Sequence, residues 1–207
     1  DDKELIDDFN NGVDVHTKTA ALVYGIDMSD VTKSQRRDAK VINFGVLYGM
    51  SPHGLSVATG MSLIEAKKYI EQYFELRAPI RKYIDTTLNK AKTDGYVETY
   101  YGRRRPTPDV NSSNYMVREA ANRQAANMPI QGTEADLMKL AMNQVEGRLD
   151  GLGMQILQVH DSILVECPEE NADKVVEILK TTMESIAPEI PVKLSVDVNV
   201  GKNWGEL

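Results

Sequence analysis

Cysteine is almost absent from this sequence, and long apolar runs are absent altogether. The single cysteine, Cys167, leaves no possibility of an internal disulfide bond, and low cysteine usage is typical of reducing compartments. No segment approaches the roughly 20 consecutive apolar residues that a membrane-spanning helix needs, and none resembles a secretory signal peptide. These absences exclude a disulfide-stapled secreted scaffold. We expect a cytoplasmic protein with no membrane partner.

An excess of positive charge is also lacking. The formal net charge is −7, which argues mildly against a nucleic-acid partner if the charge is averaged over the surface. The basic residues are nevertheless concentrated in "KSQRR" and "GRRRP", and local basic patches are what phosphate contacts need. Composition alone therefore leaves the partner open.

The remaining composition is that of an ordinary globular protein. The 207 residues, 42% apolar and 27% charged, suffice for one sizeable domain or two small ones. The sequence lacks a starting methionine and opens on "DDKELIDDF", so we expect it to be a piece of a longer protein.

Helical periodicity dominates the first three quarters of the chain. Ser62 followed by Glu65 forms a capping-box pattern, and Gly25 and Gly95 stand where helices should end. Pro129 is expected to separate two helices of the third quarter. The predicted helices cover residues 3–10, 14–24, 32–48, 62–77, 80–94, 116–127, 131–149 and 170–187.

Strand patterns are few and mostly late. Residues 96–101 alternate like a short strand, and we expect a loop over residues 103–114. Two β-branched runs meet at His160–Asp161 and predict a hairpin. Residues 192–200 alternate apolar and polar side chains, as a half-buried strand does. A helical block followed by a small helix-and-sheet block predicts an α+β fold.

One predicted helix carries a distinctive face within "RRDAKVINFGVLYG". Because four residues advance a helix by slightly more than one turn, side chains at that spacing share a face. Here they are two cations followed by two aromatics: Arg36, Lys40, Phe44 and Tyr48. The opposite side carries the apolar stripe Ala39, Ile42 and Val46, which should pack inward. By itself, the pattern fits a solvated cationic face that runs into a half-buried aromatic end as well as it fits a binding surface.

Two further patterns carry chemistry. Arg123, Asn127 and Gln131 recur every four residues and form either a plain polar helix face or a set of hydrogen-bond donors. Asp161 stands at the tip of the predicted hairpin, where any turn accepts an aspartate. A carboxylate held there is also a suitable ligand for a divalent metal such as Mg²⁺.

Several motifs taken together resemble one family. "RRDAKVINFGVLYGMS", "YVETYYGRRR", "REAANRQAANMPIQGTEADLMKLAM" and "LQVHDSILVE" are similar to the C-terminal half of the polymerase domain of family A DNA polymerases, the bacterial DNA polymerase I family. The likeness runs in order along essentially the whole chain, to the ending "VGKNWGEL". It implies a palm-derived helix in residues 1–12, a mostly helical fingers subdomain in 13–131, and the C-terminal part of the palm, a small antiparallel sheet with packed helices, in 132–207.

The resemblance implies template-directed nucleotidyl transfer from a dNTP to a primer 3′-hydroxyl. In that family, positions matching Arg36 and Lys40 hold the triphosphate and take part in catalysis, and the position of His16 also touches it. Phe44 would stack near the base and sugar of the nucleotide, and Tyr48 would occupy the template position. Stacking suits an enzyme that accepts four substrates, because every base offers a π-face.

The resemblance also implies contacts to primer–template DNA. Asp161 matches one of two aspartates that bind a pair of catalytic Mg²⁺ ions, and His160 would lie near the primer strand. Minor-groove acceptors are common to all base pairs, so donors there test pair geometry without reading sequence. The DNA-contacting positions of the family match Arg103, Arg104, Arg105, Arg123, Asn127 and Gln131, besides His160.

The sequence departs from the family pattern in two places. The second metal aspartate belongs to a pattern like D-Y-S-Q-I-E, which does not occur here, and Asp1 and Asp2 are poor substitutes at a helix start. Ser162 stands where the family usually has glutamate. We therefore expect these residues alone to be inactive and to need the thumb and upstream palm in cis or in trans. A non-catalytic nucleotide- or DNA-binding module and one subunit of a split polymerase remain alternatives.

Overall fold

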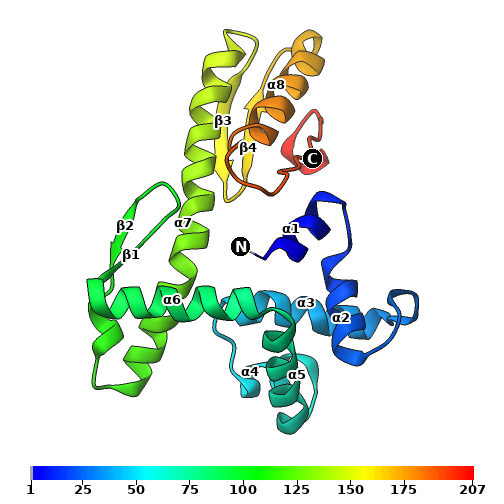
Figure 1. Ribbon diagram of the computed structural model, residues 1–207. Helices are drawn as coiled ribbons and strands as arrows, with labels where there is room; N and C mark the ends of the chain where they lie inside the picture. Colours follow the sequence, from blue (N-terminus) through cyan, green and yellow to red (C-terminus); the bar gives the residue numbers. More distant parts are fainter. Residues whose placement is uncertain (1) are drawn as a thin grey trace. The chain divides into compact units, whose positions relative to one another are not determined.

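The computed structural model describes residues 2–207, apart from the side chain of Leu47. The chain divides into two compact units, Asp1–Ile130 and Gln131–Leu207, which are described separately. Helices predominate, and each unit contains one two-stranded antiparallel sheet (Figure 1). The predicted α+β fold class is confirmed. None of the described helices combines the length and the apolar composition that crossing a bilayer requires.

Six α-helices precede the first strand in the described part of unit 1. The 3₁₀-helix η1 (Met28–Asp30) lies between the second and the third of them. One helix, over residues 52–59, has no counterpart among the predicted elements; Ser51 caps its start and Gly60 ends it with φ 80°. The helices are α1 (Lys3–Asn10), α2 (Val15–Tyr24), α3 (Lys33–Leu47), α4 (Pro52–Thr59), α5 (Leu63–Leu76) and α6 (Ala78–Asp94).

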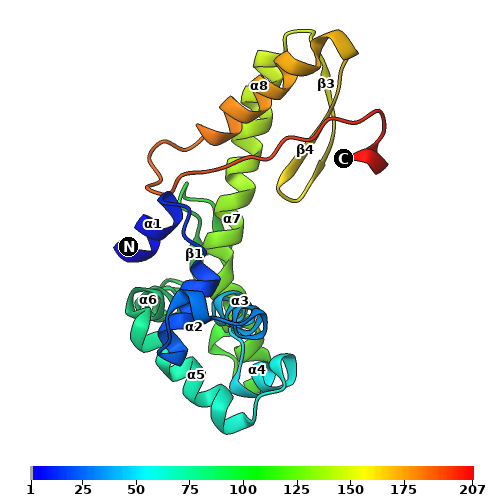
Figure 2. The ribbon, with the colours of Figure 1, turned by 90° about the vertical axis from the view of Figure 1, so that its right-hand side faces the viewer.

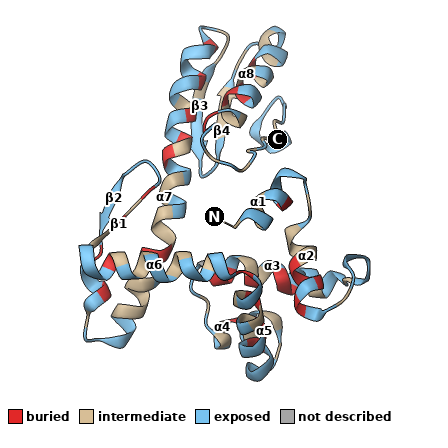
Figure 3. Cartoon of the chain, in the orientation of Figure 1, coloured by how far each residue is buried: buried red, intermediate tan, exposed pale blue. Residues whose placement is uncertain are grey.

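The main core of unit 1 lies among α2, α3, α4 and α5. The predicted inward stripe of α3 is confirmed, since Ala39, Ile42 and Val46 are 0%, 1% and 4% exposed. Ile42 and Val46 pack with Leu55 of α4 and with Tyr69 of α5. Figure 3 marks buried residues in red, among them segments of α2 and α3. Burial of one face leaves the opposite face of α3 available for function.

A buried arginine ties α1 to the junction of α5 and α6. Arg77, which is 3% exposed, lies 3.8 Å from carboxylate oxygens of Asp2, Glu4 and Asp8. Lys18 of α2 completes the network with a 2.7 Å ion pair to Asp8. Asp2 also caps α1 by accepting from the backbone N–H of Leu5. Asp2 therefore has a structural role, as the sequence indicated; Asp1 lies outside the described residues.

The loop predicted over residues 103–114 is in part a strand. β1 (Tyr96–Glu98) pairs with β2 (Arg104–Pro106), and the 3₁₀-helix η2 (Pro108–Asn111) follows. The pairing brings Glu98 opposite Arg104, whose guanidinium donates to the carboxylate at 3.3 Å and lies 4.4 Å from the Tyr96 ring centroid. A run of arginines does not by itself predict a strand. Cross-strand contacts of this kind stabilise the hairpin nevertheless.

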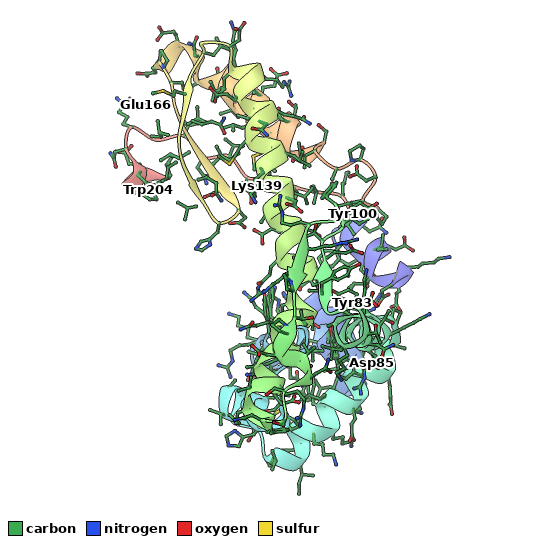
Figure 4. All side chains as sticks on the ribbon, turned by 90° about the vertical axis from the view of Figure 1, so that its left-hand side faces the viewer. Tyr83, Asp85, Tyr100, Lys139, Glu166 and Trp204 are labelled. Carbon is green, nitrogen blue, oxygen red and sulfur yellow. The ribbon has the colours of Figure 1, made fainter. Side chains whose placement is uncertain are left out.

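The expected break at Pro129 does not occur. α7 runs without interruption from Tyr115 to Leu149 and contains Pro129. Proline costs the helix one hydrogen bond, but Ala125 and Ala126 before it and Met138 after it are buried. Tyr83 of α6, labelled in Figure 4, also donates its hydroxyl to the Ala126 carbonyl at 3.1 Å. Packing of the helix on both sides of the proline outweighs the local cost.

Unit 2 comprises the rest of α7, a hairpin and one further long helix. β3 (Met154–Val159) and β4 (Ser162–Glu166) pair in the predicted antiparallel hairpin, with a bulge near Ile156. η3 (Glu169–Asn171) leads into α8 (Ala172–Glu184), and η4 (Trp204–Glu206) lies near the end. Val145 of α7 and Val175 of α8 belong to one core with β4 (Figure 2). The hairpin thus has two helices packed against it.

The strand predicted over residues 192–200 is wrong as secondary structure, although its alternation is real. In the part of the chain that the structure describes, these residues belong to no helix and no strand ladder. Leu194 and Val198 face the cores of unit 2, and Val196 between them is half-buried, while Ser195 and Asp197 are exposed. The Val196 N–H donates to the Glu184 carboxylate at 3.2 Å instead of to a strand. The sequence alternation determines which side chains are buried, but a β-strand also requires a neighbouring strand to which it can hydrogen-bond.

Candidate functional site

The candidate site in unit 1 begins with the way two helix starts are capped. Asp14 is the N-cap of α2 and accepts hydrogen bonds from the backbone N–H groups of His16 and Thr17 at 3.1 and 3.3 Å. α3 begins with a reciprocal capping box between Thr32 and Gln35. These caps fix the first turns of both helices, and α2 and α3 pack side by side (Figure 1).

Arg36 is bound to the cap of the neighbouring helix. Its Nε lies 2.6 Å and its Nη2 3.3 Å from the two carboxylate oxygens of Asp14, which is a two-pronged ion pair. The pair holds the pKa of Asp14 well below its usual range, chiefly through the Arg36 hydrogen bond, and raises the pKa of Arg36. Both side chains are more than one-third exposed, at 46% for Arg36 and 40% for Asp14. The guanidinium is therefore oriented while it stays open to an anion.

His16 and Phe44 meet where the two helices face each other. Their ring centroids are 5.7 Å apart with a 46° interplanar angle. Burial lowers the pKa of His16, and the positive charges of Arg36 and Lys40 act in the same direction, while Asp14 opposes them. The imidazole is therefore neutral over a wider pH range than a free histidine. Phe44 remains 51% exposed beside it.

The structure brings four of the sequence-predicted residues together. Lys40 is exposed and has no ion-pair partner among the described residues. Its positive charge contributes to lowering the pKa of His16. We call the set His16, Arg36, Lys40 and Phe44 the α2–α3 face. Cations beside an exposed aromatic ring suit a ligand that carries both phosphate groups and a flat ring.

Tyr48 and Arg123 lie at the end of α3. Tyr48 is the C-cap residue of α3 and is 47% exposed. Gly49 follows with φ +68°, and an ideal Cβ built on it would be 2.6 Å from Cγ of Arg123. The arginine stem therefore passes directly over the glycine backbone. A side chain from α7 is in this way brought next to the aromatic end of α3.

The other predicted basic residues are exposed, and Arg104 and Arg105 also form hydrogen bonds within the chain. Arg103, Arg104 and Arg105 are all exposed, but Arg104 is held by Glu98 and Arg105 donates to Gln124 at 3.0 Å. Tyr100, labelled in Figure 4, belongs to the connection between β1 and β2. Asn127 is half-buried and Gln131 is exposed on α7. Most of these side chains are available to an outside partner.

The hairpin tip of unit 2 presents Asp161. Val159 pairs with Ser162, so His160 and Asp161 form a two-residue connection, and His160 adopts φ 51°. The Ser162 hydroxyl donates to the Val159 carbonyl at 2.9 Å, and the Gln158 amide donates to the His160 carbonyl. Asp161 is exposed, and within residues 2–207 its carboxylate accepts no hydrogen bond. The turn is thus stabilised by other side chains, which weakens a purely structural explanation of Asp161.

A complete metal site is not formed by the described residues. Among them, no three His, Cys, Asp or Glu side chains converge on one point. Mg²⁺ commonly uses one or two carboxylates and completes its shell with water and substrate phosphates. A single exposed carboxylate on a rigid hairpin fits one ligand of such a site. It does not fit a closed structural metal centre.

Sequence reasoning missed two residues of the site. The sequence indicates Asp14 only as a helix start, whereas its ion pair with Arg36 spans 22 positions. Asn43 carries no recognisable pattern, yet its amide lies 2.9 Å from Nδ1 of His16. The helix-start signal locates Asp14 but does not indicate its partner Arg36. No local signal could have paired Asn43 with a histidine 27 positions away.

Comparison with known proteins finds relatives that match nearly the whole chain. The family profile described as DNA polymerase family A matches residues 1–206. DNA polymerase I of Deinococcus radiodurans is 49% identical over 205 residues, which are 99% of this chain and 21% of that protein. The thermostable DNA polymerase I of Thermus aquaticus is 46% identical over 204 residues, 98% of this chain and 24% of that protein.

A solved structure with a similar fold is the POL domain of Pol1 from M. smegmatis in complex with DNA primer–template and dNTP. Its TM-score is 0.89 at 38% sequence identity, over 97% of this chain and 36% of that chain. The chain belongs to DNA polymerase family A. It spans about a fifth to a quarter of the length of the curated relatives named here.

Proposed function

We propose that this chain is the nucleotide-binding part of a DNA-directed DNA polymerase. Residues 13–131 act as fingers, and residues 1–12 and 132–207 belong to the palm. The observation that carries the proposal is the α2–α3 face, where cations and an exposed ring gather on two capped helices. Membership of family A supports it, as does the similarity to a polymerase domain whose own structure contains primer–template DNA and dNTP.

The cationic half of the face binds the triphosphate. Arg36 offers a planar fork of donors whose direction is set by Asp14, and Lys40 offers a compact charge one turn further along α3. His16 adds a neutral donor between them. Arg36 and Lys40 also stabilise the charge that develops on the phosphates during transfer, which is their catalytic role.

The aromatic half of the face binds the base and sugar. Phe44 stacks near the incoming nucleotide, and Tyr48 at the end of α3 occupies the position beside the new base pair. Both rings are about half exposed and therefore available for stacking. Stacking accepts every base, so the template decides which nucleotide is used.

The DNA partner is bound by the donors of α7 and of the β1–β2 hairpin. Minor-groove acceptors near the primer terminus receive hydrogen bonds from Arg123, Asn127 and Gln131. These contacts test base-pair geometry. His160 lies near the primer strand. The backbone phosphates are contacted by Arg103, Arg104 and Arg105.

Asp161 is one ligand of the catalytic Mg²⁺ pair. When bound, Mg²⁺ supplies Lewis-acid activation of the primer 3′-hydroxyl and neutralises the triphosphate and the leaving pyrophosphate. The contribution of this chain is a carboxylate on one hairpin, two cations on α3 and a neutral donor on α2. The second aspartate has to come from another part of the polymerase.

Nucleotide binding by the 207-residue chain tests the proposal directly. Titration with dNTP in the presence of Mg²⁺ should show saturable binding that Arg36→Ala and Lys40→Ala each weaken roughly tenfold to a hundredfold, the range expected for a charge-assisted hydrogen bond. Lys67→Ala is the matched control, since Lys67 is an exposed lysine of α5 that pairs with Glu71 at 3.9 Å. Absence of binding, or an equal loss in the control, would refute the proposal.

Primer extension separates the proposed polymerase from a binding module that has lost its chemistry. If missing half of the metal ligation costs roughly 4 kcal/mol, the 207 residues alone extend a primer about a thousandfold more slowly than a complete enzyme. Addition of the thumb and upstream palm, in cis or in trans, should restore extension, and Asp161→Asn should abolish the restored activity. A complemented chain that binds dNTP but never extends a primer would instead be a non-catalytic module.

A further inference from the structure

Asn43 links His16 of α2 to the body of α3. Its side-chain amide nitrogen lies 2.9 Å from Nδ1 of His16 and 3.3 Å from the hydroxyl of Thr19. Thr19 is 3% exposed and lies one turn after Val15 in α2. The three side chains form a continuous hydrogen-bonded path between the two helices.

The direction of each hydrogen bond follows from the donors available. The Thr19 hydroxyl lies 2.8 Å from the Val15 carbonyl oxygen and 3.3 Å from Oδ1 of Asn43; donation of its only proton to the nearer Val15 oxygen leaves the Thr19 oxygen free to accept from the Asn43 amide nitrogen. The Asn43 amide has two protons, one for Thr19 and one for His16. With the Asn43 amide nitrogen facing the ring, Nδ1 of His16 is the acceptor of this contact, and a neutral ring then carries its proton on Nε2.

We propose that Asn43 is a positioning residue that holds His16 in the Nε2–H tautomer, so that a neutral imidazole presents an N–H donor to the nucleotide triphosphate. This rests on the proposed function for its ligand, but the tautomer itself does not. A histidine whose Nδ1 carried the proton would turn a lone pair toward the phosphate oxygens and repel them.

The charged groups around His16 are consistent with a neutral ring. Asp14 acts from the N-terminus of α2, and Arg36 and Lys40 act from α3. Burial and the two cations lower the pKa of His16 against the opposing carboxylate. Because two cations already serve the phosphates, a neutral donor adds a directed hydrogen bond without a third charge to desolvate.

Nitrogen NMR of the histidine rings tests the tautomer without any nucleotide. In the ¹⁵N-histidine-labelled chain at pH 8, His16 should show an unprotonated Nδ1 and a protonated Nε2. His53 and His160 serve as internal references, because the sequence contains three histidines. In Asn43→Asp the carboxylate can only accept, so the proton should move to Nδ1 and the pKa of His16 should rise. A wild-type ring with the proton on Nδ1, or a pattern that Asn43→Asp leaves unchanged, would overturn the proposal.

Nucleotide affinity tests whether the tautomer matters for binding. Asn43→Ala should weaken dNTP·Mg²⁺ binding about threefold to tenfold, the value of one hydrogen bond, and should have little further effect in the His16→Ala background. Asn111→Ala is the matched control, because Asn111 is an exposed asparagine that donates to the Lys92 carbonyl away from the α2–α3 face. An equal loss in both backgrounds means that Asn43 acts apart from His16, which refutes the positioning role.

The two experiments separate the possible failures. If the wild-type chain shows the expected tautomer but binds no dNTP, the proposed function and the presentation of the donor both fail, while the Asn43–His16 link stands. If it binds dNTP but shows the other tautomer, the proposed function stands and the positioning role fails.

Discussion

Gly49 is the position where a single methyl group should reveal the packing of α3 against α7. Its φ of +68° lies in the left-handed region, where an L side chain costs about 1 kcal/mol. A Cβ there would also lie 2.6 Å from Cγ and 3.1 Å from Cδ of Arg123. Displacing the arginine from its rotamer adds about 1 kcal/mol. We therefore predict that Gly49→Ala destabilises the chain by about 2 kcal/mol.

Gly25→Ala is the matched control for the backbone cost alone. Gly25 ends α2 with φ +66°, and nothing lies within 4 Å of an ideal Cβ on it. This substitution should cost only about 1 kcal/mol. In an Arg123→Ala background, the destabilisation caused by Gly49→Ala should also fall to about 1 kcal/mol, because the collision with the arginine side chain has been removed.

Urea unfolding followed by near-ultraviolet tyrosine circular dichroism is a suitable assay. All nine tyrosines lie between Tyr24 and Tyr115, so the signal reports on unit 1, whereas the single tryptophan, Trp204, belongs to unit 2. Equal destabilisation by Gly49→Ala and Gly25→Ala would refute the collision with Arg123. An undiminished cost of Gly49→Ala in the Arg123→Ala background would refute it as well.

Three further predictions concern the core, the ion pair and the nucleotide. Leu55→Ala, at a side chain that is 0% exposed, should cost about 2–5 kcal/mol in urea unfolding, whereas Val57→Ala in the same helix, 73% exposed, should change stability by less than about 0.5 kcal/mol. Because the folded-state pKa of Asp14 lies below its ordinary value of 3.8, the carboxylate stabilises the fold above pH ~4 and the benefit is lost on further acidification. Asp14→Asn, which keeps a good N-cap, should thus be less stable than wild type at pH 7, and the difference should shrink below pH ~4; a difference independent of pH would contradict the role of the charge. By resemblance to family A, Phe44→Tyr in a complete polymerase that carries this chain should relax discrimination against nucleotides lacking a 3′-hydroxyl, and unchanged incorporation ratios would argue against the placement of Phe44 at the sugar.

Local sequence signals locate the helix boundaries that depend on capping. Ser62 and Glu65 form the predicted capping box at the start of α5, and Gly95 ends α6 with φ 76°. The hairpin at His160–Asp161 is predictable for the same reason, since two β-branched runs with a two-residue connection have few other solutions. These features are set by interactions between residues close in sequence.

Contacts with partners outside the segment itself decide the elements for which local rules are wrong. α7 continues through Pro129 because both of its flanks are buried, and residues 192–200 form no ladder in the described chain although their side chains alternate. β2 exists because Glu98 and Tyr96 of the facing strand, six and eight positions away, interact with Arg104. In each case a partner outside the segment itself, or the lack of one, changes the balance between a local propensity and its alternative.

The candidate site divides along the same line. Periodicity alone places Arg36, Lys40, Phe44 and Tyr48 along one helix face and Ile42 on the other, because a helix fixes the direction of each side chain from its position. Only the packing of α2 on α3 brings Asp14 to the Arg36 guanidinium and Asn43 to the His16 ring. Sequence spacing sets which groups share a face, whereas the charge, orientation and proton position of those groups depend on partners that the tertiary structure supplies.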